Sequence, residues 1–588
     1  MTGEYVLGRP RPAPDWAAHL LRNTRFFLSP AALFWVVIMA ILVAPIAVFL
    51  AVGVIPGTFG LDAGALDFSA FSVLTQGKML SAMVNSLVLG VVVAVAATAI
   101  AGTVAWLVHR TDVPLRGLSA AAMFAVLITP SYLMAMGWQR LLEPGGVLEV
   151  AGIDASGARA ILYGPVGVAM VLTFKGIPFA YLAISAALRG LGQEFEHAVR
   201  VHGGSARDAA KIVLALISPA MASALAIVFA EAISDFGVAT TLGRAGGFTV
   251  ATYGIYDAIQ AFPVQFQAAS AVSWVLLLLI VIALVLQSAA LRGRSYRVLG
   301  GRTRPAARKR LGPAGKALGG TFLTALWVPV LGVPALGALS ASLVTNLGSM
   351  SEHHLSFDSY IRVLRNSDSY EPLAFSAQMA FVVATVTAFV AVIAARMLSK
   401  SRKTVMTRGL DFVLLAAVAL PGIVFAAGYI FTYNLPGVNR LGIHLYGTVA
   451  LLGLAYIASS LPATTRLLFG SLSQLQESLS HAARAHGRGP IATWFTITVP
   501  MIARPAVSAW MLTFAHIMLE LPISQLLYPP GHAPLVVGIE HALEQYDFSG
   551  GTAMQVLAIL FCLAVVGLAQ LTFRLAAPRG WLHIGRTS

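Results

Sequence analysis

Long apolar runs recur along the whole chain, each separated from the next by a short polar or glycine- and proline-containing segment. A membrane-spanning helix needs about 20 predominantly apolar residues, and twelve segments of this sequence meet that need. Several are rich in Gly and Ala, which is typical of membrane helices that pack closely against one another. The pattern predicts an all-α membrane protein with about 12 transmembrane helices. The predicted spans are 31–54, 82–108, 117–138, 160–187, 216–240, 266–291, 318–343, 375–398, 410–433, 445–468, 503–526 and 551–575.

Composition agrees with this pattern and excludes several classes of protein. Of the 588 residues, 58% are hydrophobic and only 11% are charged, whereas about 25% of the residues in a typical soluble domain are charged. Soluble enzymes, soluble nucleic-acid-binding proteins and disordered proteins are thereby excluded. Cys562 is the one cysteine of the chain, so an intrachain disulfide and a cysteine-based metal site are excluded as well. We expect no cleaved signal peptide in the first 30 residues.

The net charge of +15 is best explained by membrane topology. If the N-terminus is cytoplasmic, 31 of the 39 lysines and arginines fall in cytoplasmic segments and 7 in outer ones. This asymmetry follows the positive-inside rule and predicts that both termini are cytoplasmic. The segment 292–317 carries nine basic and no acidic residues. We interpret it as a cytoplasmic tether beside anionic lipid rather than a nucleic-acid-binding patch.

An internal repeat divides the chain into two halves. Residues 197–203 read HAVRVHG and residues 481–487 read HAARAHG, with five of the seven positions identical. Similar offsets pair Asp235 with Glu520 and Pro130 with Pro421. Two like halves are the usual sign of a duplicated unit. The predicted organisation is a cytoplasmic segment 1–30, a first six-helix half 31–291, the basic linker 292–317, a second six-helix half 318–575 and a cytoplasmic tail 576–588.

The repeated heptapeptide lies in a polar loop after the fourth span of each half, at 188–217 and 469–504. Ala and Arg favour a short helix before the glycine, and the glycine ends that helix and allows a sharp turn. A single copy of such a loop would be read as an ordinary amphipathic connection. Two near-identical copies favour a docking element that projects from the bundle.

These loops resemble the EAA loops of binding-protein-dependent ABC importer permeases, whose pattern is E-A-A-x3-G followed about nine residues later by I-x-L-P. The second loop fits at Ala482, Ala483, Gly487, Ile497, Val499 and Pro500, and the first at Ala198, Gly203, Ile212 and Leu214, the last two after a one-residue deletion. Both copies have histidine in place of the first acidic residue. The resemblance implies a fold like that of type I importer permeases. The implied coupling residues are His197, Ala198, Arg200, Gly203, Ala482, Ala483, Arg484 and Gly487.

Other stretches are similar to fused iron(III)-type permeases. They are Trp106–Pro114, Thr129–Tyr132 with Trp138, Asp235–Gly237, Glu520–Pro522 and Leu526–Pro529. This resemblance implies ferric iron as the cargo. Relatives of the same layout carry 2-aminoethylphosphonate, thiamine or polyamines, and these cargoes remain alternatives.

The chain has no Walker A motif, GxxxxGK[ST], for binding ATP phosphates. We therefore expect no catalytic residues, no metal site and no cofactor bound by this chain. The resemblance implies that two copies of a separate ABC ATPase bind the two loops and hydrolyse ATP. It also implies a substrate-binding protein that docks on outer loops such as 343–374 and 527–550, and a location in a bacterial cytoplasmic (inner) membrane, in contact with lipid and without a nucleic-acid partner.

Charged groups within membrane spans are costly and often functional. Glu231 and Asp235 are four residues apart, as are His516 and Glu520, so each pair is expected on one helix face. We predict that these four residues line the translocation path; the alternative is that they are packed or rim-exposed polar groups. Without further ligands, His516 and Glu520 are not expected to bind a metal.

Three more residues within the predicted spans have expected roles. Lys175 is expected to extend its side chain to the inner membrane surface. Pro130 and Pro421 are candidates for bends in their helices at membrane depth.

A secondary transporter with six plus six spans is the competing class. Such transporters carry a basic motif between the second and third spans. In this chain the repeated motif follows the fourth span instead, which favours the ABC permease.

Overall fold

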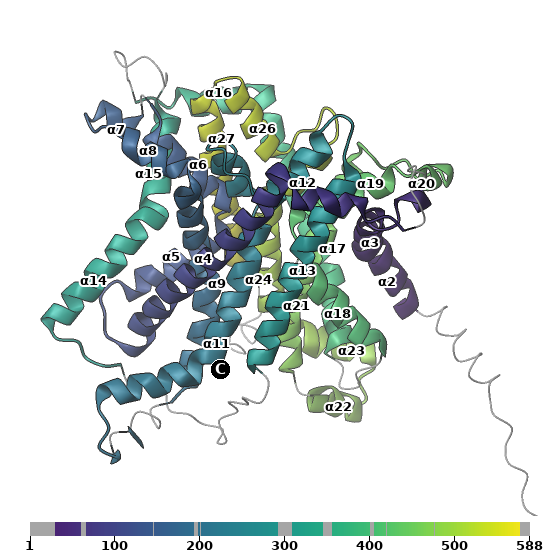
Figure 1. The fold of residues 1–588 in the computed structure, drawn as a ribbon. Helices are drawn as coiled ribbons and strands as arrows, with labels where there is room; N and C mark the ends of the chain where they lie inside the picture. The colour runs from purple at the N-terminus through teal and green to yellow at the C-terminus, as the bar shows by residue number, and fades with distance from the viewer. Residues whose placement is uncertain are drawn as a thin grey trace, which may run out of the picture.

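The computed structural model describes residues 30–59, 66–144, 146–192, 198–199, 201–291, 308–344, 355–399, 405–418, 420–475 and 477–576. These residues form a helical bundle (Figure 1) in which extended structure is limited to two isolated bridges. Within them, ten helices are long and apolar enough to cross a membrane, and a bent helix pair makes eleven if it counts as one span. The chain is thus an all-α, multi-pass membrane protein.

The two halves follow the same order of helices. In each, a first helix with an internal π-turn is followed by a long second span, a broken third span, a fourth span, a fifth span and a sixth span. The first half consists of α2 (Pro30–Ile38), η1 (Met39–Val43), α3 (Ala44–Val52), α4 (Gly77–Arg110), α5 (Arg116–Ile128), α6 (Ser131–Leu142), α9 (Pro165–Gly190), α11 (Ala206–Ser234) and α13 (Phe266–Leu291). The second half consists of α14 (Pro313–Trp327), η5 (Val328–Gly332), α15 (Val333–Leu343), α17 (Ser367–Leu398), α18 (Val405–Val418), α19 (Gly422–Tyr433), α21 (Val449–Ser473), α24 (Val499–Met518) and α27 (Phe548–Ala576).

The third span of each half is broken, which corrects two of the twelve predicted spans. Helices α5 and α6 meet at an angle of 103°, so 117–138 is not one continuous helix. In the second half, α18 and α19 replace the continuous helix predicted at 410–433. Pro130 and Pro421 stand immediately before α6 and α19, with nearly the same backbone angles (φ −59°, ψ 151° and φ −59°, ψ 142°). Proline lacks an N–H and its ring clashes with the preceding helical turn, so the helix stops.

The fifth spans start and end earlier than predicted. The structure has α11 in place of 216–240. In place of 503–526 it has a continuous helical segment from α23 (Pro490–Thr493) through η6 (Trp494–Thr498) to the end of α24. Both fifth spans therefore begin directly at the polar loops that precede them. They end before Asp235 and Glu520 are reached.

Each half places its first helix against the other half. Helix α3 packs on α19 as well as on α13, and α15 packs on α6 as well as on α27. Figure 1 shows α2 and α3 beside α19 at one side of the bundle and α15 beside α6 at the other. This reciprocal packing joins the two halves through direct contacts between their helices.

Glycine allows this exchange at matching positions. A Cβ added at Gly428 would lie 2.9 Å from the Pro45 carbonyl oxygen, and one at Gly137 would lie 2.4 Å from the Pro334 carbonyl oxygen. Gly137 and Gly428 are repeat partners, and so are Pro45 and Pro334. Small residues are the usual means by which membrane helices approach this closely.

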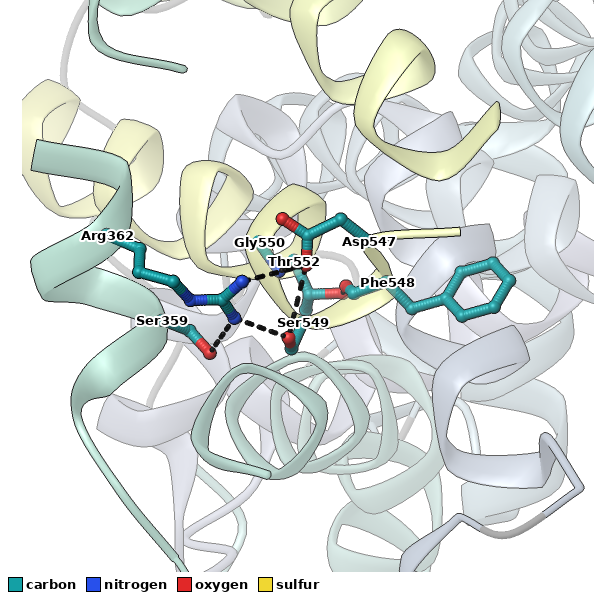
Figure 2. A network of polar contacts seen from close by, with 7 residues as sticks. All are labelled: Ser359, Arg362, Asp547, Phe548, Ser549, Gly550 and Thr552. Atoms are coloured by element: carbon teal, nitrogen blue, oxygen red, sulfur yellow. Dashed lines mark hydrogen bonds and ion pairs between the residues drawn. The ribbon is translucent and has the colours of Figure 1, made fainter. Parts of the chain in front are cut away.

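A polar network lies at one end of the bundle. Arg362, on α16 (Asp358–Arg365), donates to the Ser549 hydroxyl at 3.2 Å, and its guanidinium lies 3.7 Å from the Asp547 carboxylate (Figure 2). Asp547 in turn accepts the Gly550 N–H at 2.9 Å at the start of α27. Helix α16 and the turn before α27 therefore form one surface, at the end of the bundle opposite the repeated loops (Figure 1).

Candidate coupling loops and translocation path

The repeated loop of the second half is a short helix, a tight turn and a second helix. Helix α22 (Glu477–Ala485) is followed by a turn at Gly487, whose φ is +77°. The Arg488 N–H donates to the Ala483 carbonyl at 3.0 Å, a bond that spans five residues. This geometry is a Schellman motif, which satisfies carbonyls that the helix end leaves open and requires a left-handed residue at the turn. Figure 1 shows α22 and α23 at the lower end of the bundle.

The first half repeats this turn at the same register. Ala198 and Val199 are helical, Gly203 has φ +77°, and the Gly204 N–H donates to the Val199 carbonyl at 2.8 Å. Ser205 then begins α11, because its hydroxyl accepts the Asp208 N–H at 3.3 Å while the Asp208 carboxylate accepts the Ser205 N–H at 3.0 Å. This reciprocal capping box fixes the start of the second helix. His197 and Arg200 lie outside the described residues.

The second loop presents a mixed polar and small-residue surface. Ala482 and Gly487 are exposed, while Ala483 is buried at 6% exposure and anchors α22. Arg484 contacts the ring of His481 at 3.0 Å between Nη2 and Nδ1. A short rigid helix with a small-residue face is well suited to insertion into a groove on another protein.

Asp235 and Glu520, two of the four predicted path residues, cap the turns that follow the fifth spans. The Asp235 carboxylate accepts the Val238 N–H at 2.8 Å, and the Glu520 carboxylate accepts the Ile523 N–H at 3.0 Å. Each contact joins residues three positions apart, so the two turns are built alike. The prediction that each pair, Glu231 with Asp235 and His516 with Glu520, lies within one helix is corrected at its second member, because Asp235 and Glu520 follow the ends of α11 and α24.

These turns pack against the breaks in the third spans. In the first half, the hydroxyl of Ser131, the first residue of α6, donates to the Asp235 carboxylate. In the second half the repeat position of Ser131 is Gly422, and a Cβ there would lie 3.2 Å from Pro522 Cβ and 3.5 Å from Glu520 Oε1. The longer Glu side chain thus takes the room that serine occupies in the other half. Each half joins its broken span to its fifth span by this contact.

Glu231 and His516 occupy repeat positions on α11 and α24, and both side chains are exposed. Glu231 and Asp235 line one small cavity of about 30 Å³ together with Lys175 on α9. Glu520, by contrast, is 6% exposed and faces Tyr456 and Ser524 in the interior. The structure thus brings Glu231 and Asp235 together with Lys175, and it buries Glu520 in the second half.

Lys175 does not extend to the membrane surface, which corrects its expected role. Its ammonium donates to three carbonyls at the broken end of α5, namely Val126 at 3.1 Å, Leu127 at 3.0 Å and Thr129 at 2.8 Å. The break at Pro130 leaves these carbonyls without helical partners, and a cation is favoured at a helix C-terminus.

Sequence similarity identifies the family to which this chain belongs. Residues 101–297 and 387–579 each match the binding-protein-dependent transport system inner membrane component family. The two matches cover most of the chain, and each contains one repeated loop and one fifth span. The chain belongs to this family of transport permeases.

Curated relatives match the permease either across both halves or over a single shorter stretch. The ferric transport system permease protein FbpB of Actinobacillus pleuropneumoniae is 22% identical over 507 residues, which are 84% of this chain and 71% of that protein. The Fe(3+)-transport system permease protein FbpB 2 of Haemophilus influenzae is 23% identical over 492 residues, 83% of this chain and 89% of that protein. The putrescine transport system permease protein PotI of Escherichia coli is 25% identical over 218 residues, 37% of this chain and 74% of that protein. The permease is therefore similar to fused ferric permeases over nearly its full length.

Sequence reasoning missed three residues of the permease's candidate path. Lys175 was assigned to the surface, and Ser131 and Gly422 were not connected with the acidic turns. A signal for the latter pair was present, because Ser131 and Gly422 directly follow the two repeated prolines. Within the described residues, no group of three His, Cys, Asp or Glu side chains is placed to hold a metal ion.

Proposed function

We propose that this permease is the membrane component of an ATP-driven importer and moves ferric iron into the cytoplasm. Both termini and both repeated loops lie on the cytoplasmic side in this proposal. The distribution of lysine and arginine supports that orientation, since 31 of the 39 fall in segments that it places in the cytoplasm.

The observation that carries the proposal is the matched pair of glycine turns. Gly203 and Gly487 share φ +77° and the same five-residue hydrogen bond, although 284 residues separate them. A duplicated projection with one geometry suits two identical partners. Two copies of an ABC ATPase would bind the two loops, one on each half. The closure of the ATPase pair on ATP would then rock the halves against each other as rigid bodies.

ATP acts on those partner subunits in this proposal, since the permease has no phosphate-binding motif of the Walker A type. The permease itself binds no cofactor. Its own contribution is to transmit motion from the loops through the fifth spans, which begin directly at both loops.

A substrate-binding protein would dock at the opposite end. The joined surface of α16 and the turn before α27 supports this assignment, because Arg362 and Asp547 hold two separate segments of the second half in one arrangement. The guanidinium of Arg140, from the first half, also lies 4.6 Å from the ring centre of Phe548. A docked protein would thus contact a surface to which both halves contribute.

Ferric iron is the proposed cargo because three of the four relatives that match more than three quarters of the chain are named as ferric permeases. The path residues Glu231 and Asp235 supply carboxylates, which suit a hard cation. A polyamine is the second candidate, since a putrescine permease matches 37% of the chain. Binding assays with the partner binding protein, using ferric iron and putrescine as ligands, separate the two cargoes.

The docking role is tested by the double substitution Gly203→Pro and Gly487→Pro. Proline cannot adopt φ +77°, so both turns should be lost, and the permease should insert in the membrane but no longer copurify with its ATPase. Gly442→Pro is the matched control, because Gly442 also has φ +77° but lies outside both repeated loops. Normal copurification and import by the double variant would show that these loops do not couple the permease to the ATPase.

A further inference from the structure

Lys175 connects the broken third span of the first half to the acidic cavity. We propose that Lys175 is a gating residue of the path, whose ammonium holds the break at Pro130 in the present conformation and moves to Glu231 when the path opens. This inference rests on the proposed import function. Lys175 is a positioning residue in this scheme, and it acts through the carbonyls and the carboxylate that it contacts in turn.

In the present conformation, Lys175 holds the break in the third span of the first half. Helix α5 ends at Ile128, and the chain turns by 103° before α6 begins. The three carbonyls that accept from Lys175 lie on either side of that end. Hydrogen bonds from a charged donor are stronger than neutral ones, so the ammonium fixes the position of the break relative to α9.

The residue at the matching position of the second half makes a different contact. The repeat position of Lys175 in the second half is Ser459. The Ser459 hydroxyl donates to the Tyr456 carbonyl of its own helix, at 3.1 Å, and so remains within α21. The break at Pro421 therefore has no lysine at the matching place. A structural feature that both breaks needed would be expected in both halves, whereas a gate needs only one.

Two carboxylates offer the Lys175 ammonium a second set of acceptors. Glu231 and Asp235 line the same cavity as Lys175. The cavity volume of about 30 Å³ exceeds the roughly 10–15 Å³ that one water molecule requires in a cavity, and an ammonium group is of similar size to water. Lysine has a flexible four-carbon chain, so its head group has room to swing from the carbonyls to the carboxylate.

If the Lys175 ammonium leaves the backbone carbonyls, it needs a new partner. A charged group inside a membrane protein is costly unless it is paired. If α5 and α6 move apart as the halves rock, the carbonyl set is lost, and Glu231 then supplies a partner of opposite charge. Asp235 is already held by Ser131 and by the Val238 N–H, which leaves Glu231 as the acceptor for the moving ammonium.

The test uses the complete transporter, with ATPase and binding protein, in proteoliposomes. Lys175→Gln should unlock the break and raise ATP hydrolysis in the absence of binding protein by roughly tenfold, the factor that the loss of one charged hydrogen bond corresponds to. Glu231→Gln should have the opposite effect and lower the hydrolysis that binding protein stimulates. The double variant should behave like Lys175→Gln alone, since the acceptor has no role without the cation. Ser459→Ala is the matched control and should behave like the wild type.

Path opening is followed separately by thiol labelling. Cys562 is the one cysteine of the chain and is buried, so Cys562→Ser with Ala232→Cys places a single thiol at the wall of the cavity. A small maleimide should label it faster with Lys175→Gln and more slowly with Glu231→Gln. Should Lys175→Gln fail to accumulate, Glu231→Gln and Lys175→Arg carry the test. Lys175→Arg keeps the charge and should retain a low basal rate.

Wild-type labelling and hydrolysis in both single variants would overturn the gating role, and so would effects that simply add in the double variant. Failure of the cargo assignment looks different. In that case no variant, nor the wild type, takes up labelled ferric iron, while the labelling and ATPase pattern described for the variants persists.

Discussion

The hydroxyl of Tyr429 in the second half donates to the backbone carbonyl of Ile41 in the first half, at 2.7 Å. An α-helix would pair that carbonyl with the N–H four residues later, but this residue is Pro45, which has none. The first helix accordingly forms a π-turn over Met39–Val43. The tyrosine thus satisfies a carbonyl that the sequence of the first helix leaves open, and the bond crosses between the halves.

Tyr429→Phe should weaken the attachment of the first helix to the second half. We expect a loss of about 1 kcal/mol, because the substitution leaves the partly buried Ile41 carbonyl without its tyrosine donor. The measurement is thermal unfolding of the purified permease in detergent. Tyr446→Phe, at an exposed tyrosine, is the control and should leave the midpoint unchanged. An equal shift for both variants would contradict the role of this bond.

The glycine beside this tyrosine gives a second prediction. Gly428→Ala places a methyl group 2.9 Å from the Pro45 carbonyl oxygen, so α3 must move away from α19. Overpacking of this kind costs roughly 1–3 kcal/mol. Gly437→Ala is the comparison, because no atom lies within 4 Å of a Cβ at that position. The expected result is a lower midpoint, and faster proteolytic release of the first helix, for Gly428→Ala alone.

The sequence predicted the helical class, the two halves and the repeated loops, because these depend on local patterns of apolar and small residues. It did not predict the exchange of the first helices. Pro45 and Gly428 are nearly 400 residues apart, and no periodicity links them. It predicted bends at Pro130 and Pro421, but not that 117–138 and 410–433 each divide into two separate helices there, because hydropathy counts the apolar residues on both sides of a proline alike. Lys175 was misplaced for the same reason, because its partners are backbone carbonyls created by the break at Pro130.

The end of the linker is bound to the first half, close to the first coupling loop. Asp112 accepts the Leu311 N–H at 2.7 Å and pairs with Lys316 at 3.0 Å, and both contacts lower the pKa of Asp112 below its ordinary value. The buried guanidinium of Arg110 donates to the carbonyls of Leu188 and Leu191, at 3.1 and 3.0 Å. The linker therefore joins the second half to the corner where α9 leads into the first coupling loop.

The contact between Asp112 and the end of the linker should weaken only at low pH. A carboxyl with a lowered pKa contributes its stabilisation fully above its ordinary pKa, near 3.9, and loses it as the pH falls through the folded value. The contact should therefore be unchanged from pH 8 to about 5 and weaken only below about 4.

Asp112→Asn should open the contact between the linker end and the first half at every pH. Tryptic cleavage at Arg308, Lys309 and Arg310 at pH 8 measures the effect and should be several-fold faster in the variant, with Asp154→Asn as a control at an exposed carboxylate. Equal cleavage rates in the two variants would show that Asp112 does not hold the linker.

The contact between Gly422 and Glu520 predicts how the second half responds to added volume. Gly422→Ala brings a methyl group to 3.2 Å from Pro522 Cβ and 3.5 Å from Glu520 Oε1, so the turn that Glu520 caps must shift. Because that turn joins the broken third span to the fifth span, ATP hydrolysis should continue while import falls, by about tenfold for a cost near 1.4 kcal/mol. Gly470→Ala lies on an exposed helical position with no atom within 4 Å, and it should be neutral or slightly stabilising. Uptake and ATPase assays on the same proteoliposomes measure both quantities. A parallel fall in uptake and hydrolysis would instead indicate a general loss of folded permease, and full activity of Gly422→Ala would mean that this contact does not transmit motion between the two spans.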